Sequence, residues 1–284
     1  MKTFTAPERL DEALTLLGEA SPPTVLAGGT DLWPQWTATK TKPTHVLSLH
    51  RLEELRGITR AGDILRLGAC VTHSELTRSP LVQAACPALA AAAATVGATQ
   101  IQNRGTLGGN LANGSPAADL PPPLFTANAE VELHSRRGAR RVPITRLYRG
   151  YRDLERERDE LLVAVHIPAL PSGALERFWK VGTRRAQAIS KVVGACRLAL
   201  DEKGTISHAA LAFGSVGPVT MALDELASWL VGKEPTPEVG EKAAQLASDA
   251  VQPMDDIRST ADYRRHVVGR IVKAWIVELA TLNR

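Results

Sequence analysis

The chain of 284 residues is poor in the residues on which several classes of protein depend. Its three cysteines, Cys70, Cys86 and Cys196, form no C-x-x-C pair, which excludes a disulfide framework, a structural zinc site and an intrinsic iron–sulfur cluster. Aromatic residues make up only 4% of the chain, too few for a nucleic-acid stacking platform. No apolar run is long enough to cross a membrane and the first residues lack a signal-peptide pattern, so we expect a cytoplasmic protein without a membrane span.

Charge and metal-ligand patterns are also weak. Lys and Arg number 34 against 30 Asp and Glu, and this net charge of +4 is too small an excess to indicate a nucleic-acid partner. The seven histidines show no spacing typical of a metal site, so we predict no metal in this chain. The 44% of apolar residues and 23% of charged residues are typical of a soluble globular protein.

Two glycine-rich segments are the most informative features that are present. They read Ala27-Gly28-Gly29-Thr30-Asp31-Leu32 and Thr106-Leu107-Gly108-Gly109-Asn110. Glycine lets main-chain N–H groups approach a bulky ligand, and consecutive N–H groups form a nest for anions. We therefore predict that the two segments together hold a diphosphate ligand such as a dinucleotide. Their spacing departs from the G-x-G-x-x-G of a Rossmann site, and no Gly-Lys-Ser or Gly-Lys-Thr marks a Walker loop.

The length of the chain favours two domains, and the stretch from Pro168 to Gly173 reads as the boundary between them. We expect a first domain over 1–173 and a smaller α+β domain over 174–284. Strands and helices are segregated in the second domain. The expected strands lie at about 24–27, 46–49, 64–69, 160–168, 177–181, 189–200 and 207–213.

Local signals also predict three helix starts in the first domain. Thr5 to Glu8 reads as a capping box that opens the first helix. An alanine-rich helix is expected to run without interruption from Ser79 to about Val96. A helix that begins at Ser115 would place Asp119 near its positive end.

The glycine segments and two further stretches resemble the motifs of a known family. The second segment continues to Asp119 as Asn-Leu-Ala-Asn-Gly-Ser-Pro-Ala-Ala-Asp, and residues 178–190 read Phe-Trp-Lys-Val-Gly-Thr-Arg-Arg-Ala-Gln-Ala-Ile-Ser. In this order, the stretches resemble the FAD-binding (medium) subunit of the molybdenum hydroxylases, the family of xanthine dehydrogenase and carbon monoxide dehydrogenase. The resemblance spans nearly the whole chain. It implies an α+β fold: an FAD-binding domain of two α+β lobes, at about 1–55 and 56–173 and similar to vanillyl-alcohol oxidase, followed by a smaller α+β domain with an antiparallel sheet and helices.

The resemblance also implies which residues contact a non-covalent FAD. Backbone groups of the first loop would hold the diphosphate, and the second loop would supply further N–H groups. Asp119 would accept hydrogen bonds from cofactor hydroxyls, Lys180 would make a basic contact, and two apolar residues would line the flavin site. The full set of implied contacts is Val25, Leu26, Ala27, Gly28, Gly29, Thr30, Asp31, Leu32, Val96, Thr106, Leu107, Gly108, Gly109, Asn110, Asp119, Leu162 and Lys180.

Some alternatives stay open at the level of sequence. Asp119 can be a carboxylate in a helical turn without a ligand, and Lys180 a lysine on the surface of a strand. Trp33 either stacks near the flavin or packs in the protein. No residue is nominated for catalytic proton transfer.

The function implied by the resemblance is electron transfer within a larger complex. FAD in this chain would receive electrons from two [2Fe–2S] clusters on a small subunit and pass them to an external acceptor. A large subunit would carry the molybdenum cofactor, and a dimer of heterotrimers is expected, without nucleic acid. Two other hypotheses are a stand-alone FAD-dependent oxidase or dehydrogenase with its own substrate pocket, and a basic scaffold or nucleic-acid binder that has lost the cofactor.

Overall fold

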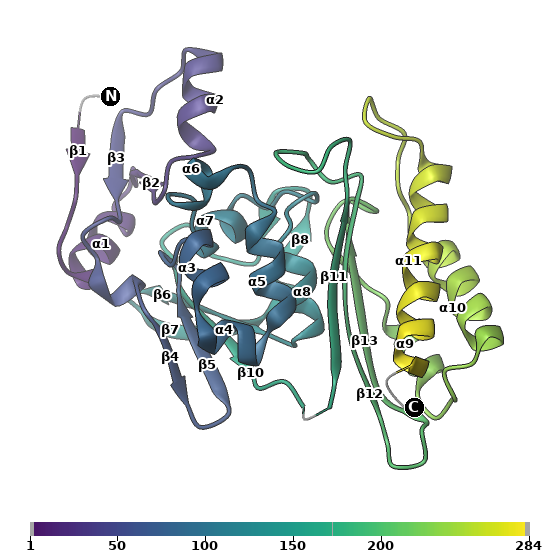
Figure 1. Cartoon of the computed structure of the whole chain (residues 1–284). Helices are drawn as coiled ribbons and strands as arrows, with labels where there is room; N and C mark the ends of the chain where they lie inside the picture. The colour runs from purple at the N-terminus through teal and green to yellow at the C-terminus, as the bar shows by residue number, and fades with distance from the viewer. Residues whose placement is uncertain (1–2, 172, 282–284) are drawn as a thin grey trace.

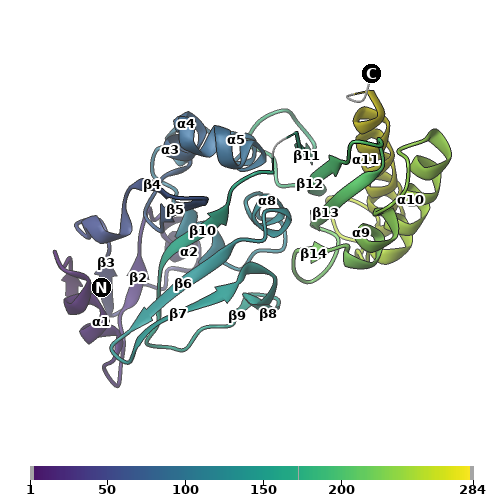
Figure 2. The same cartoon turned by 90° about the horizontal axis from the view of Figure 1, so that it is seen from below.

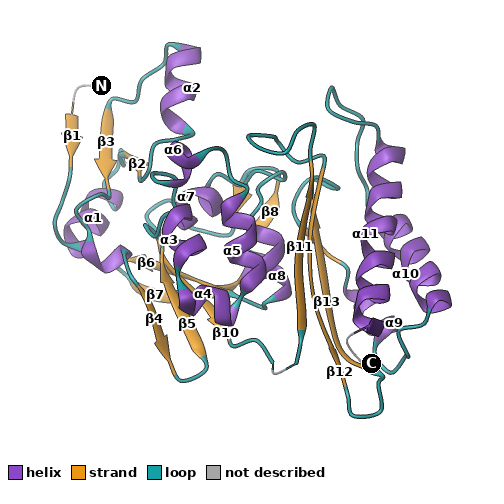
Figure 3. Ribbon diagram, viewed as in Figure 1, coloured by secondary structure: helices purple, strands orange, loops and turns teal. Residues whose placement is uncertain are grey.

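The computed structural model describes residues 3–171 and 173–281. Helices and strands are mixed along the chain, which confirms the expected α+β class (Figure 3). The chain progresses from a small sheet at the N-terminal end, through a larger sheet with its helices, to a third sheet backed by helices near the C-terminus (Figure 1). Among the residues described, no helix is both long and apolar enough to span a bilayer.

The first sheet is small and parallel, in the order β1-β3-β2. Its elements are β1 Thr3–Thr5, α1 Leu10–Leu17, β2 Thr24–Leu26, α2 Leu32–Thr39 and β3 His45–Ser48. Helix α1 buries Ala13, Leu14 and Leu17 because these positions share one face of the helix. The expected capping box was wrong, since Thr5 pairs in β1 and the cap position of α1 is Arg9.

The second sheet has five strands in the order β4-β5-β10-β6-β7. Helices cover one face of this sheet, as the view from below shows (Figure 2). The strands are β4 Ile58–Ala61, β5 Ile64–Gly68, β6 Glu130–Ser135, β7 Gly138–Pro143 and β10 Leu161–Pro168. The other elements of this region are Glu53–Leu55 (η1), α3 His73–Arg78, α4 Pro80–Ala85, α5 Pro87–Ala94, α6 Thr99–Gln102, α7 Leu107–Ala112, α8 Pro121–Thr126, Ile144–Arg146 (η2), β8 Tyr148–Gly150 and β9 Asp153–Leu154.

Two helix predictions in this region were wrong. The alanine-rich stretch is two helices, α4 and α5, because Pro87 has no N–H to donate and Cys86 takes a non-helical conformation with φ of −155°. The helix expected from Ser115 begins only at Pro121. Asp119 therefore precedes that helix.

The third sheet is antiparallel, in the order β11-β12-β13-β14. Its elements are β11 Leu175–Val181, β12 Val192–Leu200, β13 Ile206–Gly214, β14 Met221–Ala222, α9 Asp224–Leu230, α10 Pro237–Ala250 and α11 Ala261–Thr281. Helix α11 buries Trp275 against Phe213 of the sheet, with ring centroids 5.5 Å apart. This core is separate from the one under the second sheet.

A buried ion pair joins the third sheet to the helices of the second. Glu176 of β11 and Arg197 of β12 are almost fully buried, with Oε1 and Nη2 2.7 Å apart. Glu176 also accepts a hydrogen bond from the backbone N–H of Ala88, at the start of α5. The break between α4 and α5 thus supplies a free N–H for an acidic side chain of a distant strand.

Candidate functional site: a cleft between the glycine loops

A cleft of about 760 Å³ lies between the first sheet and the helices of the second. Residues from both glycine loops line it, together with Val96 and Leu162. The implied contact residues found on its wall are Val25, Ala27, Gly28, Gly29, Thr30, Asp31, Leu32, Val96, Thr106, Gly108, Gly109, Asn110 and Leu162. The structure therefore brings together residues that are far apart in the sequence.

The two loops are in direct backbone contact. A Cβ atom on Gly28 would lie 1.9 Å from the carbonyl oxygen of Arg104 and 3.1 Å from the Cα of Gly105. Gly29 has a φ of +73°, a left-handed conformation that glycine adopts without strain. Any side chain at position 28 would push the loops apart, so this glycine sets the width of the cleft at this point.

The first loop presents unused hydrogen-bond donors. In the part of the chain that the structure describes, the N–H groups of Gly28, Gly29, Thr30 and Asp31 have no acceptor. The N–H of Trp33 donates to the carbonyl oxygen of Gly29 at 3.0 Å, and this hydrogen bond closes the turn between β2 and α2. A row of free N–H groups on a cleft wall is suited to an anionic group of a ligand.

The second loop differs from the expectation of free N–H groups. Leu107 donates to the carbonyl oxygen of Val71 and Gly108 to that of Ala69, at 2.9 and 2.8 Å. Gly109 donates to the side chain of Thr106 at 3.1 Å. Asn110 donates to the carbonyl oxygen of the same Thr106 at 2.9 Å. These bonds hold the loop against the strand-to-helix connection before α3, and they occupy the N–H groups of residues 107–110.

What the second loop offers a ligand is space and a polar side chain. Gly109 is exposed in the cleft, and within 4 Å a Cβ there would meet only the Oγ1 of Thr106, at 2.9 Å, so the Thr106 side chain would have to move. The side-chain oxygen of Asn110 is buried without a hydrogen-bond partner in the described chain. A buried polar atom without a partner is unfavourable, so it points to a missing ligand group or water.

His73 is a cleft residue that the sequence analysis missed. It is 2% exposed, its ring lies against Gly105, and its Nδ1 is buried without a partner among the described residues. Burial lowers the pKa of His73 to about 4, so its imidazole is neutral at pH 7. No metal-ligand or catalytic spacing marks it in the sequence, since its neighbours in space come from other segments.

Asp119 and Lys180 lie outside the cleft wall and pair with each other. The Lys180 Nζ is 2.5 Å from Asp119 Oδ2, and it also donates to the carbonyl oxygen of Thr95. Asp119 accepts a further hydrogen bond from Ser190 at 2.6 Å. Burial raises the pKa of Asp119, although Lys180 and Ser190 act in the opposite direction. The side chain of Lys180 is only 12% exposed, which rules out a lysine on the strand surface. The pair is linked to the cleft because Thr95 immediately precedes Val96.

Three further residues that the sequence analysis considered lie outside the cleft wall. Leu26 ends β2 and Leu107 is fully buried in the core, and neither is on the cleft wall. Trp33 is 56% exposed on α2, with its ring 6.0 Å from that of Trp36, so it neither packs in the core nor lines the cleft.

The comparison with protein families agrees with this geometry. Residues 1–170 match the FAD binding domain in molybdopterin dehydrogenase, and residues 177–279 match the CO dehydrogenase flavoprotein C-terminal domain. The chain belongs to this family of flavin subunits. The resemblance noted in the sequence is thus confirmed over both parts of the chain.

Individual relatives cover nearly the whole length. The carbon monoxide dehydrogenase medium chain of Hydrogenophaga pseudoflava is 32% identical over 95% of this chain and 94% of its own. The putative xanthine dehydrogenase FAD-binding subunit of Escherichia coli strain K12 is 34% identical over 95% and 92%. Among solved structures, carbon monoxide dehydrogenase from H. pseudoflava superposes with a TM-score of 0.93 at 31% identity, covering 99% of this chain and 97% of that one.

The cleft residues fit the cofactor of the family. Free N–H groups at Gly28–Asp31, the open wall at Gly109 and the unpartnered oxygen of Asn110 are the groups that a diphosphate and its ribosyl or ribityl hydroxyls require. Val96 and Leu162 provide apolar wall for a ring system. The chain is therefore an FAD-binding oxidoreductase subunit.

Proposed function

We propose that this chain binds FAD non-covalently in the cleft and serves as the electron-transfer subunit of a molybdenum-containing hydroxylase or dehydrogenase. The observation that carries the proposal is the backbone contact of Gly28 with Arg104 and Gly105, beside a row of unused N–H groups. When bound, FAD supplies a redox centre that exchanges electrons one or two at a time. The residues of this chain bind and orient it.

Each group of residues has its own role in the proposal. The N–H groups of Gly28–Asp31 bind the diphosphate, and Asn110 accepts a hydrogen bond from a cofactor hydroxyl. Val96 and Leu162 contact the rings. Asp119 and Lys180 act next to the cleft, where the lysine charge favours an anionic reduced flavin. Leu26 and Leu107 belong to the two loops but lie outside the cleft wall, and they hold the loops in place rather than touching the cofactor.

The partner chains are proposed from the relatives and from what this chain lacks. The three cysteines of the chain are buried and free, so we propose that a small subunit carries two [2Fe–2S] clusters and a large subunit carries the molybdenum cofactor. The relatives include medium chains of such dehydrogenases. We propose a dimer of heterotrimers in the cytoplasm. The two family matches support a division of the chain near residues 173 and 174.

The flavin content of the purified full chain tests the cofactor. We expect a yellow protein that releases FAD on heating, with one FAD per chain. A colourless chain that takes up no FAD but binds nucleic acid with steep salt dependence would instead support a scaffold.

Co-purification tests the place in the complex. A tagged chain should recover two partner chains, with molybdenum and iron in the recovered material but not in the chain alone. A single chain that oxidises a substrate and reduces an acceptor without partners would contradict the proposal in favour of a stand-alone oxidase.

A further inference from the structure

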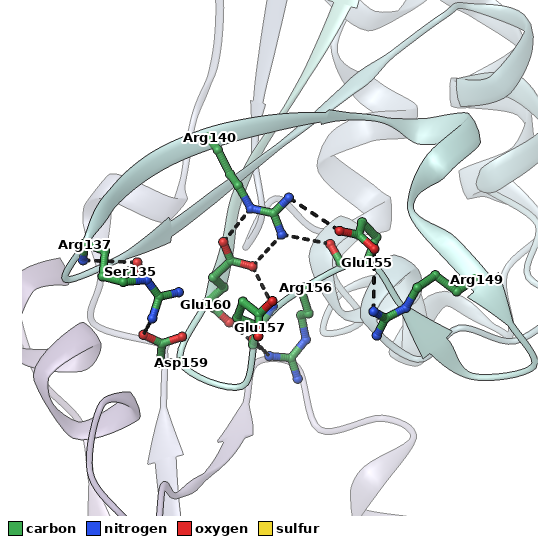
Figure 4. A network of polar contacts seen from close by, with 9 residues as sticks. All are labelled: Ser135, Arg137, Arg140, Arg149, Glu155, Arg156, Glu157, Asp159 and Glu160. Carbon is green, nitrogen blue, oxygen red and sulfur yellow. Dashed lines mark hydrogen bonds and ion pairs between the residues drawn. The ribbon is translucent and has the colours of Figure 1, made fainter.

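The segment that closes one side of the cleft, residues 148–160, is rich in arginine and in acidic residues. Several of its charged side chains take part in a network of polar contacts (Figure 4). Arg140 binds Glu160 through Nε and Nη2, at 2.6 and 2.8 Å. Arg149 pairs with Asp153 and Glu155. The carboxylates of the segment are therefore largely engaged by arginines that do not line the cleft.

Three arginines of the same segment line the cleft instead: Arg152, Arg156 and Arg158. None of the three forms an ion pair with a carboxylate of the described chain. Arg156 donates to the carbonyl oxygens of Glu157 and Glu160, which fixes its position. Arg152 and Arg158 have no hydrogen-bond acceptor among the described residues. Positive charge is thus concentrated on the cleft side.

The backbone at Arg152 adds an independent observation. Its φ of +55° is in the left-handed region, where a glycine or asparagine is less strained. A Cβ on Gly114, which follows the cleft residue Asn113, would lie 2.9 Å from the Cα of Arg152. The turn is therefore packed tightly against the end of α7. The guanidinium of Arg152 lies over the exposed ring of Tyr151, 5.7 Å from its centroid, and no carboxylate of the described chain engages it.

The cleft wall carries three arginines against two carboxylates, Asp31 and Glu160. Glu160 is held by Arg140 in a two-bond ion pair, and this pairing lowers the pKa of its carboxyl. The other carboxylate on the wall, Asp31, accepts a hydrogen bond from the neutral side chain of Gln35 and keeps its charge, so it offsets one of the three arginines. The same cleft is lined by the first loop, whose N–H groups at residues 28–31 have no acceptor in the described chain. The cleft is thus suited to a ligand with at least two negative charges.

We infer that Arg152 and Arg158 form a cationic rim that attracts and holds the diphosphate of the cofactor, with Arg156 as a fixed third charge. The inference rests on the proposed function and adds residues that the glycine loops did not indicate. Because the side chains are exposed at the rim, they act mainly through charge and raise the rate of association.

The test compares ligands with and without phosphate on the full-length apoprotein. The double variant Arg152→Gln/Arg158→Gln should bind FAD and ADP about tenfold more weakly at low salt, and the difference should shrink as NaCl is added. Riboflavin, which has no phosphate, should bind both proteins equally. Arg149→Gln is the matched control, because Arg149 is in the same segment but is paired and outside the cleft.

Three outcomes would overturn the inference: unchanged FAD and ADP binding in the double variant, an equal loss for riboflavin, or an equal loss in the control. Should the double variant fail to fold, Arg158→Gln alone answers the question, since Arg158 makes no hydrogen bond in the described chain. A wild-type chain that binds riboflavin and ADP but not FAD contradicts the proposed function alone. A wild-type chain that binds none of the ligands contradicts both proposals.

Discussion

At the scale of residues, the cleft depends on a few positions where a side chain is either forbidden or left without a partner. Gly28 allows two backbones to touch, and Gly109 leaves the cleft open. His73 and Asn110 each bury one polar atom without a partner in the described chain. The glycines could be found from the sequence, because paired glycines are conspicuous. The buried histidine could not, because its isolation depends on the fold around it.

Substitution of Gly109 by valine tests the open wall. Its side chain would project into the cleft and fill space that the diphosphate needs, so Gly109→Val should abolish FAD retention. The measurement is the ratio of flavin to protein absorbance after purification. Gly150→Ala is the control, since a Cβ at 150 meets nothing within 4 Å and the residue is outside the cleft. An unchanged flavin ratio in Gly109→Val would refute the placement.

Substitution of His73 tests the neutral buried imidazole. Because its folded pKa, about 4, is below the ordinary value of about 6.5, the unfolded chain binds more protons between these pH values. Stability is therefore lost as the pH falls through this window. Between pH 7 and pH 4.5, the free energy of unfolding of the wild-type apoprotein should fall by about 2 kcal/mol more than that of His73→Gln. Urea unfolding at the two pH values measures the difference. The exposed His266→Gln should behave like wild type.

At the scale of elements, each of the seven strands expected from the sequence is found near its predicted place, whereas the predictions of helix ends failed. The alanine-rich stretch has high helix propensity throughout, but Pro87 ends the hydrogen-bond ladder and the chain turns at Cys86. Because of that break, the N–H of Ala88 has no acceptor within its helix. It donates instead to the carboxylate of Glu176 on β11. The partner is 88 residues away in the sequence, so no local pattern could reveal it.

Glu176→Gln tests this connection between elements. The substitution keeps the shape of the side chain but leaves the charge of Arg197 buried without a counterion, so the apoprotein should be destabilised by about 3 kcal/mol. Chemical denaturation gives the free energy of unfolding. The control variant Asp262→Asn removes an exposed ion pair with Arg265 and should change the free energy of unfolding by less than about 0.5 kcal/mol. Similar losses in the two variants would contradict the structural role of the buried pair.

At the scale of the whole molecule, the second and third sheets meet at charged contacts. The Asp119–Lys180 pair crosses from the loop before α8 to β11, and Ser190 of the following loop completes it. The pair lies one residue from the cleft wall through Thr95. Any change here is expected to affect both the fit of the third sheet and the environment of the cofactor.

Two variants separate these effects. Lys180→Ala leaves Asp119 buried without its cation, so it should destabilise the protein by about 3 kcal/mol and lower the flavin midpoint potential or the FAD affinity. The double variant Asp119→Leu/Lys180→Met should recover stability, because no charge remains buried, but should not recover the flavin properties. Unfolding curves and a redox titration of the flavin supply the two readouts. Normal potential and affinity in both variants would assign the pair a purely structural role.

The sequence alone determined the order of the motifs, the α+β class and the family, because these depend on local patterns of glycine and of apolar periodicity. Only the tertiary structure decided how the loops are used. It placed Gly28 against Arg104, engaged two N–H groups of the second loop with Val71 and Ala69, and gave those of residues 28–31 no acceptor in the described chain. It also paired Asp119 with Lys180. A hydrogen bond depends on which groups meet in space, and a chain that folds back on itself brings those groups from segments that the sequence keeps apart.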